Sequence, residues 1–492
     1  MTDLRTAPAG APASAHGAAD PRRWLALGVI AVAQLMVVLD ASIVTIALPS
    51  AQHALHISTA NRQWVVTAYT IAFGGLLLLG GRIADFMGRK RIFIVGLIGF
   101  AAASALGGAA QNAGMLFGAR ALQGAFAALM APAALSLISV TFTEARERAK
   151  AFGVFGAIAG GGAAIGLVLG GLLTEYASWR WCLLVNVPIS LIAAVAAVRL
   201  VHESRATGNT SYDIPGTVTA TGGLMALVYG LTTASTHGWG SATTLGYLGL
   251  AVALLVAFVI IELRSANPLL PMRVILDRNR GGSFLGSFLT GVGMLGMFLF
   301  LTFYFQGTLH YSALKAGFAF LPFSAGVIVA ATLASRVMPR VGPRPMMVGG
   351  FLAGAVGLVW LTQIGVHTSY ALHVLPAELV MSLGLGFAFV PMSSTALLGV
   401  GNHDAGVASA TLNTSQQVGG SLGTALLNTI YATAATGYIA AHGHSPAVVA
   451  QAQVHGYTVG FVFGAAALIA AAVVAFALVR ARREQLAAPA PA

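Results

Sequence analysis

The sequence predicts an all-α membrane protein with 14 transmembrane helices, arranged as two six-helix bundles with two extra spans between them. Three observations lead to this fold class. The 492 residues are 57% hydrophobic and only 8% charged, with a mean hydropathy of +0.83. The apolar residues form runs of about 20, which is the length that crosses a hydrocarbon core of ~30 Å as a helix. Lys and Arg gather in alternate connections between these runs.

The composition excludes a soluble globule, because so few charges could not cover the surface of a chain of this length. The apolar residues must therefore face lipid. Helices are the predicted spanning element, since the runs are continuous and lack the in–out alternation of a membrane β-barrel. In chain order the runs cover 24–48, 63–81, 92–110, 114–138, 151–173, 181–199, 214–235, 244–262, 282–306, 316–335, 346–365, 372–398, 406–432 and 457–479.

The positions of the cations predict the orientation of these spans. With a cytoplasmic N-terminus, 22 of the 26 Lys and Arg residues fall on the cytoplasmic side. Arg62, Arg180 and Lys315 fall outside, and Arg120 lies within a span. Because cytoplasmic loops carry the excess of Lys and Arg, we expect a multi-pass protein of the cell membrane with both termini cytoplasmic.

Two short loops indicate an internal repeat. ADFMGRKR (84–91) follows the second span and MPRVGPR (338–344) follows the tenth, each with a glycine among basic or turn-forming residues. We therefore predict that two six-helix bundles are repeats of one another. The predicted regions are a disordered cytoplasmic tail at 1–22, an N-terminal six-helix bundle at 23–201, two inserted spans at 202–263, a C-terminal six-helix bundle at 264–480 and a cytoplasmic tail at 481–492.

Several other functions find no support in the sequence. The net charge of +12 lies in short clusters between apolar runs, so no nucleic-acid partner is expected. The single cysteine, Cys182, allows no internal disulfide. The pair His442 and His444 has no neighbouring Cys or acid pair, so no metal is expected. No Walker A motif or nucleophile–His–acid set occurs, and we expect neither an enzyme nor a cofactor.

Three ionisable residues lie within predicted spans: Asp40, Arg120 and Glu378. A charge inside the bilayer costs ~2.5–3.5 kcal/mol on the insertion scale, so such groups face a partner or a cavity. Asp40 is either a carboxylate permanently paired with Arg120 or a helix, or a carboxylate that binds the transported proton. Arg120 cannot deprotonate and would hold an acid or a polar substrate group. Glu378 is either an interfacial acid or a second cavity carboxylate.

Polar and small residues mark further faces of the spans. Gln123 lies one turn from Arg120 on the same helix face. Asn413, Gln416 and Gln417 share a face of the thirteenth span, as a polar cavity lining or as interhelical hydrogen-bond donors. Tyr304 stands among aromatic residues that suit a lipophilic ligand.

Glycines mark a contact surface on the fifth span. Gly162, Gly166 and Gly170 repeat every four residues and form a smooth stripe. Such stripes let two membrane helices approach closely, so we predict helix packing along this face.

A series of motifs resembles the major facilitator superfamily, in particular its fourteen-span drug:proton antiporter branch. GRIADFMGRKR (81–91) is similar to the family's signature loop, LDASIVTIALP (39–49) to its first-helix motif and RALQGAFAA (120–128) to its fourth-helix motif. SWRWCLLVNVP (178–188), GLGFAFVP (384–391) and DAGVASATLNTSQQVGGSLGTA (404–425) also resemble that branch. The similarity runs from about residue 24 to 480.

The resemblance implies two bundles that rock around a central cavity lined by spans 1, 4, 9 and 12. It assigns a conformational latch to Asp85, Gly88 and Arg89. A basic loop with a turn glycine would explain Gly88 and Arg89 but not Asp85. One departure is Leu167, which follows Gly166 where the antiporter motif has proline.

From these patterns we expect a proton-coupled exporter of lipophilic small molecules that works by alternating access, with small molecules, protons and the lipid bilayer as its partners. The expected site is Asp40, Arg120 and Glu378 for proton coupling, and Gln123, Asn413, Gln416, Gln417 and Tyr304 for the cavity. We expect a monomer. An importer or uniporter of the same fold is an alternative that Leu167 keeps open. A non-transporting membrane receptor is a further alternative, which the short tails disfavour.

Overall fold

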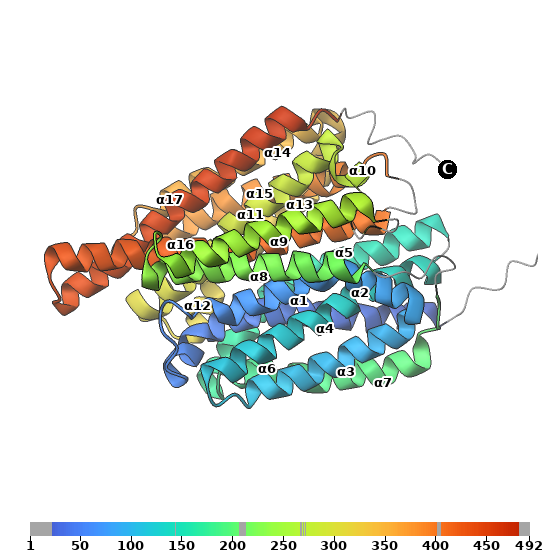
Figure 1. Cartoon of the computed structure of the whole chain (residues 1–492), viewed down its shortest axis with the longest axis horizontal. Coiled ribbons are helices and arrows are strands. Elements are labelled where there is room, and N and C mark those ends of the chain that lie inside the picture. Colours follow the sequence, from blue (N-terminus) through green and yellow to red (C-terminus); the bar gives the residue numbers. More distant parts are fainter. Residues whose placement is uncertain are drawn as a thin grey trace, which may run out of the picture.

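A computed structural model describes residues 22–142, 144–205, 213–265, 268, 270, 272–400 and 405–481. Almost every described residue is helical, and the helices run roughly side by side through the molecule (Figure 1). The tails expected at 1–22 and 481–492 lie outside the described residues apart from Arg22 and Ala481.

The first seven helices pack among themselves. α1 runs along α5, α4 contacts both α2 and α3, and α3 contacts α7. A short α6 precedes α7, and the two together cover the sixth apolar run. Their bounds are α1 Arg23–Ala54, α2 Trp64–Met87, α3 Arg89–Gly108, α4 Ala113–Thr141, α5 Ala145–Tyr176, α6 Trp181–Leu184 and α7 Asn186–Leu200.

Two helices follow between the groups. α8 (Ile214–His237) and α9 (Ala242–Arg264) pack against each other, and α8 also contacts α2 and α16. α9 is strongly apolar yet mostly exposed: only 11% of its most apolar window is buried in the protein. A helix with this pattern buries its side chains in lipid instead.

The remaining helices form a second group that lies beside the first (Figure 1). α11 packs on α16 and α17, α14 packs on α15 and α17, and α13 packs on α15. The hairpin of α16 and α17 projects at the left of Figure 1. The bounds are α10 Met272–Ile275, α11 Arg278–Phe303, η1 Tyr304–Thr308, α12 Ala313–Ala319, α13 Leu321–Val341, α14 Pro343–Leu361, η2 Tyr370–Val374, α15 Leu375–Ala396, α16 Ala405–His442 and α17 Pro446–Leu478.

Among the described residues, eleven helices are long and apolar enough to cross a membrane, or twelve if the bent pair Trp64–Leu77 and Leu79–Met87 is one span. The protein is therefore a multi-pass helical membrane protein. α16 is not among these helices, and the apolar part of α5 is the shorter stretch Gly162–Tyr176.

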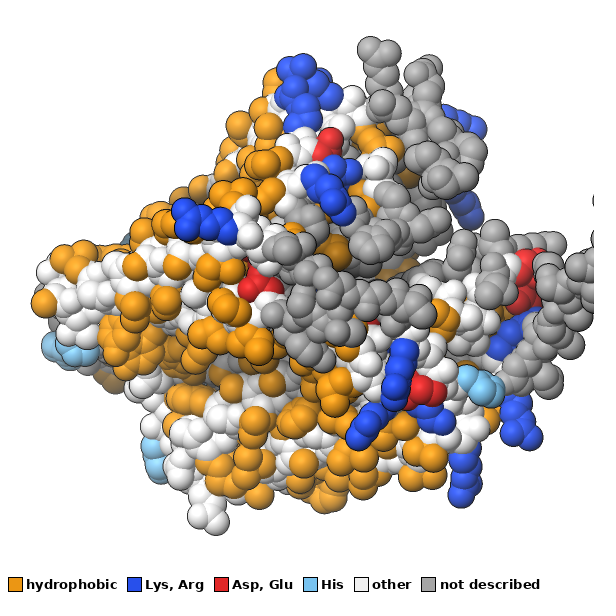
Figure 2. All heavy atoms as spheres, turned by 45° about the vertical axis from the view of Figure 1, so that its right-hand side comes forward, with side chains coloured by type: hydrophobic (Ala, Val, Ile, Leu, Met, Phe, Trp, Pro, Cys, Tyr) orange, Lys and Arg blue, Asp and Glu red, His pale blue; other side chains and the backbone are white. Residues whose placement is uncertain are grey.

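The surface separates apolar and basic regions. Figure 2 shows apolar side chains over much of the surface that faces the viewer. The projecting end at the left of that view shows no Lys or Arg side chains among the described residues. A broad apolar flank with cations concentrated toward one end suits a protein that lies in a bilayer.

The same hinge recurs in both groups of helices. Gly88 ends α2 and begins α3 with φ +108° and ψ 125°, while Gly342 ends α13 and begins α14 with φ +88° and ψ 162°. Residues other than glycine rarely adopt a positive φ, because their Cβ atom clashes with the backbone there. The two glycines occupy matching places in the two loops that the sequence shows as an internal echo.

Candidate functional site

The site is a charge pair inside the first group of helices. Asp40 lies in the second half of α1 and Arg120 lies in the second turn of α4, and both side chains are at most 1% exposed. Arg120 Nη1 donates to Asp40 Oδ2 at 2.6 Å. Two opposite charges at this distance can remain buried only together, since either one alone would lack both water and a counter-charge.

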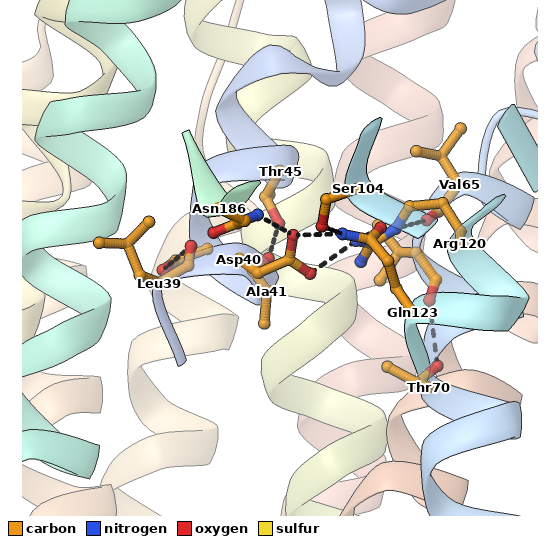
Figure 3. Close-up of polar contacts among 12 residues, drawn as sticks. Leu39, Asp40, Ala41, Thr45, Val65, Thr70, Ser104, Arg120, Gln123 and Asn186 are labelled. Carbon is orange, nitrogen blue, oxygen red and sulfur yellow. Dashed lines mark hydrogen bonds and ion pairs between the residues drawn. The ribbon is translucent and has the colours of Figure 1, made fainter. Parts of the chain in front are cut away.

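Neutral amides complete the coordination of the carboxylate (Figure 3). Asp40 Oδ1 accepts hydrogen bonds from Asn186 Nδ2 at 2.8 Å and from Gln123 Nε2 at 3.0 Å. Gln123 Oε1 accepts from Arg120 Nη1 at 2.7 Å, and its amide also donates to Ser104 Oγ at 2.7 Å. The ionised carboxylate is thus held by three donors, which stabilises its charge without water.

The guanidinium is fixed from two more directions. Arg120 Nε donates to the Val65 carbonyl oxygen of α2 at 2.9 Å, and its carbon Cζ lies 4.4 Å from the centre of the Tyr69 ring. Together these contacts join α1, α2, α3, α4 and α7 at one point. Most of this buried polar network is satisfied, which favours one packing arrangement, but Asn186 Oδ1 and the Tyr69 hydroxyl have no hydrogen-bond partner among the described residues.

This arrangement sets what the pair can do. As an ionised group, Asp40 accepts from Arg120, Gln123 and Asn186. These three donors occupy three of the roughly four lone-pair sites of the carboxylate, and all three lie on other helices. Pairing with Arg120 is therefore the state of Asp40 in this conformation.

Glu378 lies in a different environment, in the first turn of α15. It is fully buried, so it is not an interfacial side chain reaching toward water. Tyr370 of η2 donates to Glu378 Oε2 at 3.3 Å, and Oε1 has no hydrogen-bond partner among the described residues. None of the hydrogen bonds or ion pairs among the described residues joins it to Asp40 or Arg120. The structure therefore brings together two of the three predicted coupling residues.

The predicted cavity residues are dispersed. Gln123 belongs to the Asp40 network, whereas Tyr304 lies in an aromatic core and donates from its hydroxyl to the Gly365 carbonyl at 2.8 Å. Asn413 is exposed and bonds the Ser409 carbonyl of its own helix. Gln416 and Gln417 are half-buried on α16, and Gln417 lies against α2. Their part in a cavity stays a prediction.

The glycine stripe of α5 lies against α1. A side chain at Gly162 would meet Leu35 and Val38, one at Gly166 would meet Ser42, and one at Gly170 would meet Ile43. The stripe thus provides the close helix contact that small residues allow. Leu167, on the neighbouring face, is buried and its carbonyl meets Gly317 of α12.

The predicted latch residues surround the hinge at Gly88. Arg89 pairs with Asp85 one turn earlier at 2.8 Å. Glu203, just after α7, accepts from the backbone N–H groups of Lys90 and Arg91 at 3.1 and 3.2 Å. This carboxylate sits at the N-terminus of α3, where the helix dipole favours negative charge.

Sequence reasoning missed several members of these sites. Asn186 stood inside a quoted motif, but its contact with Asp40 depends on the packing of α7 beside α1. Ser104 and Glu203 carry no local signal for their roles. Arg62 was assigned to an outer connection, yet its side chain is only 3% exposed.

The geometry defines a class: a multi-pass helical protein with a buried ion pair and two related groups of helices, as membrane carriers have. The family model of the Major Facilitator Superfamily matches residues 30–424. The chain belongs to this superfamily, whose members are transporters and not enzymes.

Named relatives extend the match over nearly the whole chain. The chain is 52% identical to the puromycin resistance protein pur8 of Streptomyces alboniger, over 94% of this chain and 93% of that protein. It is 38% identical to the cephamycin export protein CmcT of Amycolatopsis lactamdurans, over 84% and 86%. It is 32% identical to the multidrug efflux pump LfrA of Mycolicibacterium smegmatis, over 83% and 81%.

A solved structure shows the same fold. The bacterial homologue of the human lysosomal transporter Spinster superposes with a TM-score of 0.66 and covers 94% of this chain and 98% of its own. Its sequence identity is 14%, so the likeness concerns the fold alone.

Proposed function

We propose that the chain exports lipophilic small molecules, antibiotics among them, in exchange for protons, by alternating access across the cell membrane. Relatives named for puromycin resistance, cephamycin export and multidrug efflux support this substrate class. Puromycin is the first candidate substrate, because the relative named for it shares half of the residues over nearly the full length.

The observation that carries proton coupling is the buried pair of Asp40 and Arg120. In the proposed cycle Asp40 takes up the proton, and Arg120 transfers the effect to substrate binding because it loses its counter-charge at that moment. A proton entering down ~100 mV contributes ~2.3 kcal/mol. This work sustains a gradient of roughly fifty-fold for a neutral substrate, before any pH difference is added.

The proposed topology has fourteen spans, because α2, α5 and α16 would join the eleven helices that meet the length and composition criteria. The basic surface is placed in the cytoplasm with both termini. The bundles are then 23–201 and 264–480, with the inserted spans at 202–263.

The remaining predicted residues have proposed roles within this cycle. Glu378 is a second proton site in the C-terminal bundle, supported by its burial and its unbonded Oε1. Asn413, Gln416 and Gln417 offer polar groups to the substrate. The contacts of Asp85, Gly88 and Arg89 support a latch that closes the cytoplasmic side.

A uniporter or importer of the same fold is the second candidate. Leu167 favours it, since proline at that position would free a backbone carbonyl of α5 whereas leucine leaves the helix unbroken.

The test compares puromycin susceptibility in cells with and without the gene, each with and without a protonophore. Export predicts that the gene lowers cellular puromycin at least about tenfold, a ~1.4 kcal/mol gradient, and that the protonophore removes the difference. Equal steady-state puromycin with and without the gene, reached faster when the gene is present, would favour the uniporter. Greater accumulation of puromycin in cells that carry the gene would reverse the direction of transport.

A further inference from the structure

The two groups of helices meet at the end of the molecule where α1 ends and α2 begins. Hydrogen bonds cross this seam: Gln306 Nε2 donates to the Ile46 carbonyl at 2.9 Å, Glu175 accepts from the Leu314 backbone N–H at 3.0 Å, and Thr70 of α2 bonds Ser421 of α16. In the proposed orientation this is the outer end, so the seam closes the route to the outside.

Arg62 lies inside this seam, directly before α2. Its guanidinium carbon is 3.8 Å from the centre of the Phe303 ring in α11 and 4.9 Å from that of the Tyr431 ring in α16. Its Nε donates to Asn428 Oδ1 at 3.2 Å. All three partners belong to the second group of helices.

The side-chain amide of Asn428 also forms hydrogen bonds with the first group of helices. It donates to the Thr59 carbonyl at 3.1 Å and to Gln63 Oε1 at 2.8 Å. Gln63 in turn donates to Thr232 of α8 at 3.3 Å. The residues around Arg62 therefore fasten both groups and one inserted helix at a single point.

The charge of Arg62 has no carboxylate partner within ion-pair distance among the described residues, and its Nη2 has no hydrogen-bond partner there. A guanidinium cannot lose its proton, and it attracts the faces of aromatic rings when water is excluded. Both rings and the amide reach it only while the two groups touch. When they separate, water replaces all three contacts.

We propose that the seam is the outer gate of the transporter and that Arg62 keeps it closed by binding Phe303, Tyr431 and Asn428 of the opposite group. The inference rests on the proposed alternating-access function and adds a residue that controls it. Arg62 acts as a positioning residue: it touches the opposite bundle rather than the substrate, and it sets how often the outer side opens.

Arg180 provides a matched control. It also lies at the outer end, near an aromatic ring (Trp179, 4.7 Å), and donates to carbonyl oxygens, those of Gly108 and Ala110 at 2.9 and 2.5 Å. These partners all belong to its own group of helices, so its contacts persist in either state of the gate.

The test measures opening of the seam with a reporter thiol. Ser421 is 1% exposed and lies two turns along α16 from Asn428. Ser421→Cys in a Cys182→Ser background is labelled with a membrane-impermeant thiol reagent added outside intact cells. Gly317→Ala is the positive control, because a Cβ there would overlap the Leu167 carbonyl across the seam.

Arg62→Gln should raise the labelling rate at least about tenfold, which corresponds to ~1.4 kcal/mol in the opening equilibrium. Arg180→Gln should change it less than about twofold. Arg62→Lys keeps the charge but loses the planar stacking group, so it should also raise the labelling rate. If Arg62→Gln does not reach the membrane, the labelling rate of Arg62→Lys tests the role of Arg62.

Unchanged or slower labelling in the Arg62 variants, or an equal rise in Arg180→Gln, would overturn the assignment of the gate. Labelling needs no substrate, so the result is separable from export. A gate that responds to Arg62 in a chain that exports no drug would refute only the export proposal. Intact export with unresponsive labelling would refute only the role of Arg62.

Discussion

At the scale of single residues, we expect the Asp40 network to determine the stability of the first group of helices and, in the proposed cycle, proton coupling. Among the described residues, Arg120 supplies the only positive charge bonded to the carboxylate, while Gln123 and Asn186 supply dipoles. Removing one member of a buried ion pair costs more than removing both, because the survivor keeps its charge without compensation.

Arg120→Leu should therefore destabilise the protein by about 3–5 kcal/mol, since Asp40 would remain buried alone. The double variant Asp40→Leu, Arg120→Leu should recover much of that loss but no proton-coupled transport. Thermal unfolding in detergent and puromycin export measure the two effects. If the double variant were as unstable as the single one, the ion pair would not be the source of the instability.

Part of this network could be predicted from the sequence. The isolated charges within apolar runs marked Asp40 and Arg120, because charge inside a bilayer is rare and costly. Their partnership with Asn186 was not predictable, since residues 40 and 186 meet only after α1 and α7 pack. Arg62 shows the same limit: its position near a span end suggested a loop, whereas rings from α11 and α16 cover it.

At the scale of elements, the hinge between two helices is used twice. Gly88 and Gly342 each join a pair of helices at positive φ, but their surroundings differ. A Cβ on Gly88 would lie 2.7 Å from the Glu203 carboxyl carbon, whereas nothing lies within 4 Å of one on Gly342. The matched pair can separate backbone strain from the contact with Glu203.

Gly342→Ala should cost about 1–3 kcal/mol for the backbone conformation alone, because glycine is essentially the only residue that adopts φ +88° with ψ 162°. Gly88→Ala should cost more and should also slow export, because the alanine methyl group displaces Glu203 from the N-terminus of α3. Unfolding temperatures and export rates of the two variants provide the comparison. Equal effects of both substitutions would show that Glu203 adds nothing to the latch.

The helices themselves were largely predictable, since each apolar run corresponds to a helix or to a pair of consecutive helices. The interruptions were not. No local pattern in the sequence marked the π-helical turns at Tyr304–Thr308 and Tyr370–Val374 or the short α6. The glycine stripe of α5 indicated a close contact, but its partner, α1, came only from the fold.

At the scale of the whole molecule, the proposed alternating access depends on the contact between the two groups of helices at the end where α1 ends and α2 begins. Arg62, Gln306 and Glu175 cross the seam there, and α8 lies against both α2 and α16. The sequence predicted the two-fold plan from its loop glycines and the orientation from its cations. It could not predict which end is closed, because that depends on contacts between residues more than a hundred positions apart.

The central claim is that Asp40 couples proton movement to drug movement. The most direct measurement is puromycin accumulation in proteoliposomes with an acidic lumen, with protein-free vesicles giving the passive background. The wild-type chain should accumulate puromycin above that background until a protonophore is added. Asp40→Asn should show no gradient-driven accumulation, while it still exchanges labelled for unlabelled puromycin, which shows that it is folded. Accumulation by Asp40→Asn at the wild-type level would contradict the account.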